Sequence, residues 1–402
     1  MKENLTIKYE TVQQTARRLN VTPRTIQKWA KEGKIDGAVL VGRSYIIPAD
    51  TDFSSVIEKK LTEKKLAQAS AKPYLPLVGG SYPLGKSGDY INSITLPNRR
   101  KLAQAEQYYY SGQSRKTSEL LENLLECEDL GTALSADVMY AFANIALERT
   151  HRANAALELI NKHVNTILKS ATNTHLRAYA VFVATSQAVL LHKDLPSDIP
   201  PMQDEMKHLP EGIRQFAAYI LAYQAFLDKD YSRSLGIADT ALSYSNKFYP
   251  LPYIHLLLVK CIVLMCMKRT AEAKECFLKA YHSARPDYYI EPFSEVHMLL
   301  GGLPEICLKR DHPEDFKRLI EITVSYGASW RRIHNTVTNR TVTNNLTPTE
   351  FTIAMLYTKS WTAKEIATHM EMSQRMIKYY IASIYDKLGV SSREELRIHM
   401  LP

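Results

Sequence analysis

The chain has 402 residues, of which 45% are hydrophobic and 23% charged, which is the composition of an ordinary soluble globular protein with two to four domains. The longest apolar window, residues 254–267, is too short to span a bilayer and contains Lys260. Because Lys2, Glu3 and Asn4 precede no apolar run, we expect no secretory signal, a cytoplasmic location and no membrane partner.

The net charge of +9 lies at the two ends of the chain. Residues 1–72 hold 14 Lys and Arg against 8 Asp and Glu, and residues 328–402 hold 10 against 6, so the ends carry +6 and +4 and the middle carries −1. Basic ends favour contact with a polyanion, and nucleic acid is the commonest such partner. We therefore expect double-stranded DNA to bind at both ends.

The cysteines offer neither a disulfide framework nor a zinc site. Their number is odd and no two are spaced Cys-x-x-Cys, which is typical of reduced, buried thiols. No Ser/His/Asp set, paired carboxylates or metal cluster stands in a supporting pattern, so we expect no enzymatic activity, no cofactor and no metal. The cysteines are Cys127, Cys261, Cys266, Cys276 and Cys307.

The amino-terminal segment predicts two short helices joined by a three-residue turn. Thr11 and Gln14 form a capping-box pattern that begins the first helix. Thr22 caps the second helix, with Pro23 at a position where a missing N–H costs nothing. One face of this second helix is apolar, and the other carries candidates for contact with a major groove. The apolar residues are Ile26, Trp29 and Ala30, and the candidates are Arg24, Thr25, Gln27 and Lys28.

Alternation after Gly33 predicts a small hairpin, or wing, with Arg43 at its tip, within reach of a phosphate or the minor groove. The stretches "TARRLNVTPRTIQKWAKEGKI" and "GRSYIIP" resemble the excisionase and MerR-like winged helix-turn-helix families. This resemblance implies DNA binding by residues 1–52. A winged helix that contacts protein instead of DNA is the alternative.

Residues 53–96 have the composition of a linker, with a charged, helix-prone stretch at 54–71 and then a Pro- and Gly-rich loop. The loop contains "GGSYPLGKS", which fits the phosphate-binding pattern of nucleotide-binding proteins. Such a loop needs a buried strand before it and a long helix after it, yet prolines interrupt both flanks. We therefore interpret Gly79, Gly80 and Gly85 as turn residues and keep a nucleotide-dependent switch as the weaker alternative.

Residues 97–335 predict paired amphipathic helices whose turns recur roughly every 38 to 42 residues, except over an irregular segment at 192–211. The stretches "YILAYQAFLDKDYSRSLGIADTALSYS" and "LVKCIVLMCMKRTAEAKECFLKAYHSA" resemble tetratricopeptide repeats, and the whole region resembles the looser sensor domain of MalT-type regulators. The resemblance implies a groove for a small-molecule, peptide or protein effector. The predicted turns lie near Gly112, His151, Lys193, Asp230, Lys268 and Arg310.

Tyrosines are abundant in the repeats, and a rigid amphipathic ring suits ligand contact, although packing in the core is its commoner role. They include Tyr108, Tyr109, Tyr110, Tyr219, Tyr223, Tyr288 and Tyr289.

Residues 336–402 predict four short helices with strong start signals. These signals are Thr347-Pro348 with Glu350, Thr362 with Glu365, Ser373, and Ser391 with Glu394. Gly389 ends the third helix. The expected core residues are Ile366, Ala367, Met370, Ile377, Ile381, Ile384 and Leu388.

The stretches "LTPTE", "KEIA" and "MSQRMIKYYIASIYDKLGVSSREE" closely resemble the LuxR-type (GerE-like) DNA-binding domain. In that family the third helix enters the major groove. The resemblance implies that three residues face bases, namely Lys378, Tyr379 and Ala382, and that three lie near phosphates, namely Arg375, Lys364 and Lys387. This sequence departs from the family at Met376, Tyr380 and Ser360, where threonine, histidine and glycine are usual.

Together these patterns predict a mainly α protein with three parts: an amino-terminal winged helix-turn-helix, a tetratricopeptide-like α-solenoid at 97–335 and a four-helix LuxR-type domain at 336–402. We expect a bacterial, nucleoid-associated transcription regulator that binds DNA as a homo-oligomer and is controlled by an effector bound to the repeats. A helical-repeat scaffold whose terminal bundles mediate oligomerisation is the alternative.

Overall fold

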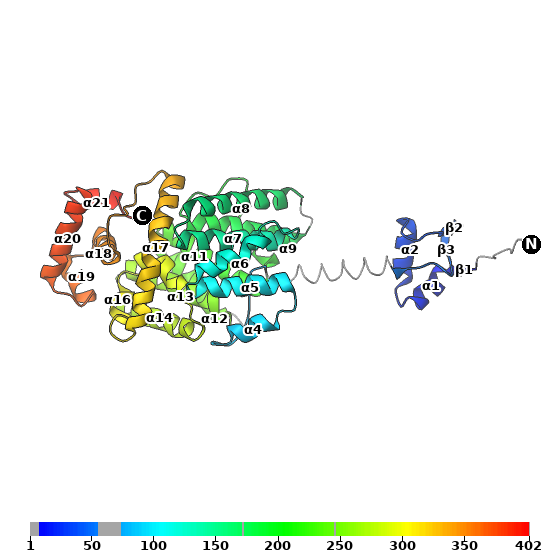
Figure 1. The fold of residues 1–402 in the computed structure, drawn as a ribbon, viewed down its shortest axis with the longest axis horizontal. Helices are drawn as coiled ribbons and strands as arrows, with labels where there is room; N and C mark the ends of the chain where they lie inside the picture. Colours follow the sequence, from blue (N-terminus) through cyan, green and yellow to red (C-terminus); the bar gives the residue numbers. More distant parts are fainter. Residues whose placement is uncertain (1–7, 55–73, 171–172, 245–246, 402) are drawn as a thin grey trace, which may run out of the picture. The chain divides into compact units, whose positions relative to one another are not determined.

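The computed structural model describes residues 8–54, 74–170, 173–244 and 247–401 (Figure 1). The chain divides into two compact units, Met1–Ala71 and Lys72–Pro402. The protein is mainly α, as predicted, and the sheet in the described residues is a small one in the first unit. The helix expected at 54–71 lies, except for Ser54, outside the described residues.

The first unit packs two helices against a three-stranded antiparallel sheet of order β1-β3-β2. Its elements are β1 (Tyr9–Thr11), α1 (Val12–Arg18), α2 (Pro23–Lys31), β2 (Val39–Val41) and β3 (Ser44–Pro48). The predicted capping box of Thr11 and Gln14 is present, and so is the cap at Thr22. The predicted inward residues of α2 are buried, in a core that includes Ile47 of β3. Strand β1 was not predicted, because three residues are too few to show a period.

The second unit consists mainly of antiparallel helix pairs. The pairs are α5 (Pro97–Tyr110) with α6 (Ser114–Leu121), α7 (Leu130–Ala146) with α8 (Thr150–Ser170), α11 (Glu211–Leu227) with α12 (Tyr231–Tyr244), and α13 (Pro250–Cys266) with α14 (Thr270–Ala284). The irregular segment 192–211 follows α9 (Thr174–Leu190) and contains the short α10 (Met202–Glu205) and η2 (Met206–His208). The remaining elements before the carboxy-terminal domain are α4 (Ser87–Ser93), η1 (Glu122–Leu124), η3 (Arg285–Asp287), α15 (Glu291–Val296), η4 (His297–Leu299), α16 (Leu303–Cys307) and α17 (Pro313–Thr338).

A residue with left-handed backbone follows the first helix of each pair, and α9 ends in the same way. After α11 and α13, for example, the chain reverses with hydrogen bonds from Asp230 N to Ala225 O and from Arg269 N to Leu264 O, both 2.9 Å long. This is the Schellman pattern, which satisfies carbonyls at the helix end. The left-handed residues are Gly112, Glu148, His192, Lys229 and Lys268, so the first five predicted turns are confirmed to within three residues.

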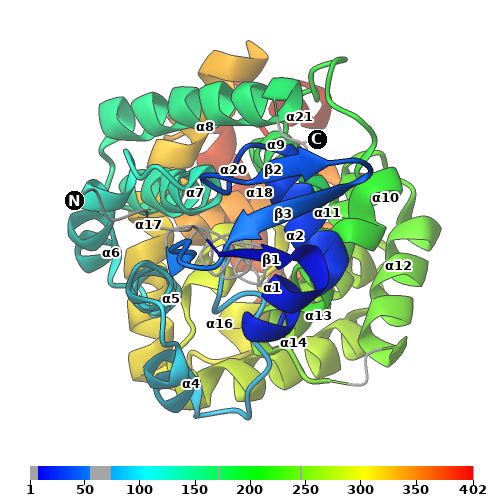
Figure 2. The ribbon, with the colours of Figure 1, turned by 90° about the vertical axis from the view of Figure 1, so that its right-hand side faces the viewer.

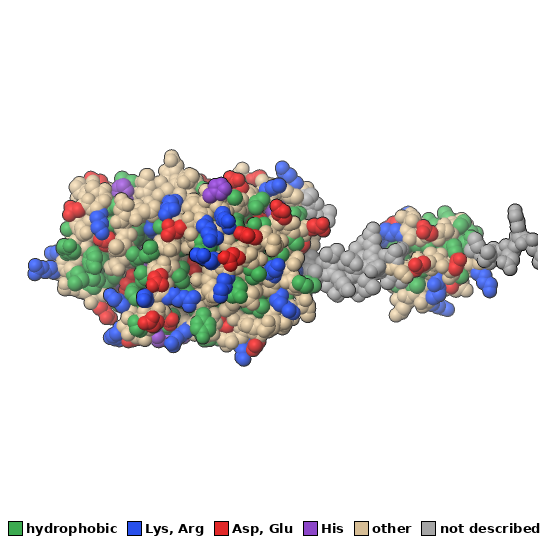
Figure 3. Space-filling model, in the orientation of Figure 1, with side chains coloured by type: hydrophobic (Ala, Val, Ile, Leu, Met, Phe, Trp, Pro, Cys, Tyr) green, Lys and Arg blue, Asp and Glu red, His purple; other side chains and the backbone are tan. Residues whose placement is uncertain are grey.

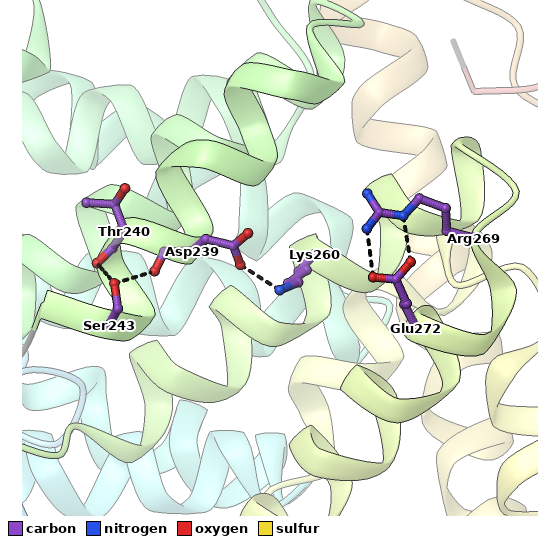
Figure 4. A network of polar contacts seen from close by, with 6 residues as sticks. All are labelled: Asp239, Thr240, Ser243, Lys260, Arg269 and Glu272. Atoms are coloured by element: carbon purple, nitrogen blue, oxygen red, sulfur yellow. Dashed lines mark hydrogen bonds and ion pairs between the residues drawn. The ribbon is translucent and has the colours of Figure 1, made fainter.

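Some polar contacts of α12, α13 and α14 are partly exposed to solvent. Figure 4 shows Lys260 of α13 donating to Asp239 of α12 at 2.6 Å, and Arg269 pairing with Glu272 at 2.7 Å. Ser243 Oγ also donates to the backbone oxygens of Asp239 and Thr240. Exposed ion pairs of this kind contribute about 0–1 kcal/mol each, so the array depends chiefly on its apolar core.

The helix array curves until its first and last parts meet. Ile290 N donates to Tyr110 O at 2.8 Å, and Gln107 Nε2 donates to Asp287 O at 3.1 Å. Helix α17 packs against α7 and α8, while Figure 2 shows α4, α5 and α6 on the side of this unit opposite α10 and α12. The closure buries most of the tyrosines considered for ligand contact. Tyr109, Tyr110, Tyr219, Tyr223 and Tyr289 are buried, Tyr108 is half-buried, and Tyr288 is exposed.

The "GGSYPLGKS" loop binds a carboxylate of this same chain. The backbone N–H groups of Gly85 and Ser87 donate to the two oxygens of buried Asp287 at 2.7 and 3.0 Å. Gly85 has φ +76°, as expected for a turn glycine, and the preceding residues form turns and no strand. Two of the amides that a nucleotide-binding loop would direct at phosphates are therefore already satisfied by Asp287.

We expect Asp287→Asn to lower the free energy of unfolding by about 1.5–3 kcal/mol, because it weakens two hydrogen bonds to a buried charged acceptor. Asp89→Asn is the matched control, since Asp89 in the first turn of α4 is exposed and forms an ion pair with Lys86 at 3.2 Å. Urea unfolding followed by circular dichroism measures both changes. Equal stability of the two variants would contradict the anchoring role of Asp287.

Glu106 anchors the segment that precedes this loop. Its fully buried carboxyl accepts hydrogen bonds from Leu77 N and Val78 N, the shorter at 2.7 Å. Burial raises the pKa of Glu106 to about 8, although the two backbone hydrogen bonds act in the opposite direction. The folded chain therefore holds a proton here that the unfolded chain releases near pH 4.5.

The free energy of unfolding should fall as pH rises from 4.5 to 8, by at most about 1.4 kcal/mol per pH unit from Glu106, because only the unfolded state is deprotonated in this window. Glu106→Gln should remove that contribution, whereas Glu119→Gln, at an exposed position, should keep it. Urea unfolding between pH 5 and 9 tests this. Parallel pH curves for wild type and Glu106→Gln would rule out the raised pKa.

No helix in the described ranges is both long enough and apolar enough to cross a membrane.

Candidate nucleic-acid interface

In the first unit, the outward face of α2 carries most of the predicted DNA contacts. Arg24, Gln27 and Lys28 are exposed and spaced three and four residues apart, so they form one stripe along the helix. Thr25 differs, because it is half-buried and its hydroxyl lies 2.9 Å from that of Thr22, the helix cap. Arg24, Gln27 and Lys28 can therefore reach a groove, and Thr25 supports the start of the helix.

The wing has the predicted form. Gly42 and Arg43 are the two central residues of the turn between β2 and β3, and the last pair before the turn is Val41 with Ser44. Gly42 has φ +62°, the backbone that two-residue hairpin turns require at this position. Arg43 is exposed at the tip. The edge strand β2 also exposes apolar side chains, with Val39, Leu40 and Val41 exposed by 46–58%.

The carboxy-terminal domain consists of α18 (Pro348–Thr358), α19 (Ala363–His369), α20 (Gln374–Leu388) and α21 (Arg393–Ile398). The start signals of the first three helices are confirmed, and Gly389 ends α20 with φ +64°. The predicted start of the fourth helix was wrong by one residue, because Ser392 caps it through Glu395 N. Ser391 N instead donates to the side chain of Glu395 at 2.7 Å.

Helix α20 separates an apolar face from a polar one. Ile377 and Ile384 are fully buried, while Ile381 and Leu388, also expected in the core, are only half-buried. On the other side, four residues form one exposed face, because the later three follow Arg375 by three, four and seven positions. Tyr379, one of the four, is 71% exposed. In Figure 3, Lys and Arg side chains project at the left end, where α19 and α20 lie in Figure 1. The four exposed residues are Arg375, Lys378, Tyr379 and Ala382.

The two remaining predicted phosphate contacts lie in different surroundings. Lys364 is exposed on α19. Lys387 instead donates to both oxygens of Glu350 at 2.7 and 2.9 Å, which ties the end of α20 to the start of α18. Burial raises the pKa of Glu350, but hydrogen bonds from Lys387 and Thr347 outweigh this and hold the pKa below its ordinary value. Lys387 thus has an internal partner that the sequence did not indicate.

Contacts between the carboxy-terminal domain and the repeats were also missed by the sequence reasoning. Lys268 forms an ion pair with Glu365 at 2.7 Å, and His369 Nε2 donates to Gly301 O at 2.7 Å. Lys359 Nζ lies 3.1 Å from Cys266 Sγ. These contacts hold α18 and α19 against the repeat array and leave the exposed face of α20 open. No local pattern could have revealed them, because the partners lie far apart in the sequence.

Ser360 occupies a backbone position suited to glycine. It follows α18 with φ +65°, and the next residue completes a Schellman turn by donating from Trp361 N to Leu356 O at 3.2 Å. A side chain costs energy in this left-handed conformation. The departure from the usual glycine therefore preserves the turn at some cost in stability.

Comparison with family models identifies two parts of the chain. Residues 344–400 match the model described as bacterial regulatory proteins, luxR family, and residues 11–51 match a helix-turn-helix domain. The resemblances to a LuxR-type domain and to an excisionase-like helix-turn-helix are confirmed. Neither the curated proteins nor the solved structures compared with the chain match it. The chain thus carries a helix-turn-helix domain at each end, and these two domains support a DNA-binding transcription regulator.

We expect Ser360→Gly to raise the free energy of unfolding by about 0.5–1 kcal/mol, because glycine adopts a positive φ without steric cost. Ser360→Ala is the control, since it removes the hydroxyl but keeps the strained Cβ. Thermal unfolding followed by circular dichroism compares the two variants. A gain in both, or in neither, would contradict strain as the cause.

Proposed function

We propose that this protein binds specific DNA sequences through both terminal domains, and that its helical-repeat domain senses an effector or partner that controls this binding. The exposed face of α20 carries the proposal. There Lys378 and Tyr379 are presented to solvent by a helix whose opposite side is anchored by Ile377 and Ile384. A rigid, exposed helix of this kind can enter a major groove.

Each predicted contact has a role in this proposal. Lys378 pairs with a guanine edge, and Tyr379 and Ala382 contact neighbouring bases. Arg375 and Lys364 bind phosphates and set the register of the helix. Lys387 contributes less to DNA affinity, because Glu350 already neutralises its charge.

The amino-terminal domain supplies a second DNA contact. Its stripe of Arg24, Gln27 and Lys28 lies in a major groove, and Arg43 at the wing tip reaches a phosphate or the minor groove. Two DNA-binding domains in one chain raise the effective concentration of the second once the first has bound. A homo-oligomer would extend the same effect to repeated half-sites.

Control by the repeats rests on the docked carboxy-terminal domain. Its contacts with the array include the Lys268–Glu365 ion pair, of which both side chains are 42% exposed. A ligand that binds the docked and the released domain with different affinity shifts the population between these two states. An effector bound at the array would in this way change the placement of α20 and the occupancy of a promoter.

A second candidate function is a protein-interaction scaffold. The exposed edge strand β2, with apolar residues Val39, Leu40 and Val41, favours protein contact by the amino-terminal domain. A scaffold of this kind would show no salt-dependent affinity for DNA.

Binding to a randomised duplex library, with sequencing of the bound fraction at several salt concentrations, tests the proposal. We expect an enriched motif and a linear fall of log affinity with log salt. Lys378→Ala should cost about 1–3 kcal/mol of discrimination at one base position, and Arg24→Ala should weaken a second part of the site. Lys317→Ala, on the exposed surface of α17, is the control.

Absence of an enriched motif together with negligible affinity at low salt would contradict DNA binding and favour the scaffold. Binding of ATP that Lys86→Ala abolishes would instead support the nucleotide-dependent switch.

A further inference from the structure

Arg331 of α17 is a buried cation that has no acidic partner among the described residues. Its side chain is 8% exposed, and within the described part of the chain it forms no ion pair. Its Nε donates to Asn344 Oδ1 at 2.6 Å, and Nη1 lies 2.8 Å from the weakly accepting Sδ of Met298. Buried charges in proteins are normally paired, so this arrangement is unusual.

The ring of Phe351 lies 5.4 Å from the guanidinium carbon and gives Arg331 some compensation. Burial lowers the pKa of Arg331 to about 10, so the group is still charged at neutral pH. The hydrogen bonds to Asn344 and Met298 use two of its five N–H groups. The guanidinium of Arg331 can therefore donate to a further acceptor.

A cavity of about 350 Å³ lies beside Arg331, at the junction of the repeats and the carboxy-terminal domain. We call it the junction cavity. Residues of α17 form one wall, and residues 344–348 with Phe351 form the other. The apolar lining includes Ala328, Leu346 and Pro348, and the rim reaches solvent at Val324, which is 49% exposed. Its volume lies at the lower end of the range of small-molecule sites.

Thr323 lines the junction cavity, and its buried hydroxyl lacks a partner among the described residues. The residue is 4% exposed. Thr323, Gly327 and Arg331 are spaced four residues apart, so they share one face of α17. A Cβ at Gly327 would lie 3.0 Å from Arg331 Nη1, so glycine leaves room for the guanidinium. Arg331 and Thr323 thus lie on one face of α17, and no acidic side chain lines the cavity in the described part of the chain.

The chemistry of the lining selects the ligand. A guanidinium binds a carboxylate through two parallel hydrogen bonds, and the buried Thr323 hydroxyl can donate a third once its side chain rotates toward the cavity. A single cation balances one negative charge but not the two of a phosphate monoester, and no second cation lines the cavity as described. The apolar wall opposite suits a short hydrocarbon body.

We propose that the junction cavity binds a small organic monocarboxylate, held by Arg331 and Thr323, and that this ion is the effector of the regulator. The second part rests on the function proposed above. Because the cavity is lined both by α17 and by the segment that begins the carboxy-terminal domain, an ion bound there favours the docked arrangement. The repeats and α20 are thereby coupled through one ligand.

Isothermal titration calorimetry on the full-length protein without DNA tests the site. The probes are sodium butyrate, sodium benzoate, neutral butyramide and inorganic phosphate. We expect at least one carboxylate to bind and butyramide and phosphate not to bind. Arg331→Gln should weaken carboxylate binding at least about tenfold, because the charge-assisted hydrogen bonds are lost. Arg332→Gln is the matched control, since the adjacent Arg332 forms an exposed ion pair with Glu148.

Thr323→Val, nearly isosteric, should weaken carboxylate binding by about fivefold, which corresponds to one hydrogen bond, and it keeps the test valid if Arg331→Gln fails to fold. The proposal is overturned if neither carboxylate binds the wild type, if phosphate binds in their place, or if both the Arg331 and Thr323 variants bind as the wild type does. A carboxylate that binds here but leaves DNA affinity unchanged overturns the effector role alone. Failure of DNA binding itself leaves the calorimetric result intact.

Discussion

The fold of the second unit depends on how its helices end: a residue with left-handed backbone follows the first helix of each pair. In the repeats, Glu148, Lys229 and Lys268 each adopt positive φ immediately after a helix, and the next N–H bonds back into the last turn. This reversal brings the following helix back alongside the first. The apolar faces of the two helices then meet, and each pair packs against the next. The same turn at Asn20 and Glu371 separates the two helices of each DNA-binding motif.

These turns cost free energy, and other interactions must compensate for that cost. A side chain in the left-handed region costs about 1 kcal/mol, so each non-glycine turn is unfavourable by itself. The compensation comes from the returning hydrogen bond and from burial of apolar helix faces in one continuous core. The curvature that results brings α17 against α7 and α8 and places its carboxy-terminal part beside the last domain.

Two acidic side chains bind groups of the same chain that could otherwise meet an external anion. Asp287 binds the amides of the glycine-rich loop, and Glu350 binds Lys387 at the end of α20. Arg331 has no such acidic partner in the described structure, although it is more deeply buried than Lys387. The loop amides and Lys387 thus have anionic partners within the chain, whereas Arg331 favours binding of an external anion.

Local hydrogen-bonding patterns and periodicity in the sequence predicted many of the helices of this protein and their starts. The helix starts at Thr11, Thr347 and Thr362 follow from hydrogen bonds between residues three apart, and the inward position of Ile377 follows from the helical period. The start of the last helix was predicted at Ser391 instead of Ser392, because each serine has a glutamate three residues later. Tertiary structure alone decided which groups are left free for a ligand. Asp287 contacts Gly85 only once the array has closed, and Arg331 contacts Phe351, with no acid beside it among the described residues, only once the last domain has docked. No local periodicity carries information about contacts over such distances in the chain.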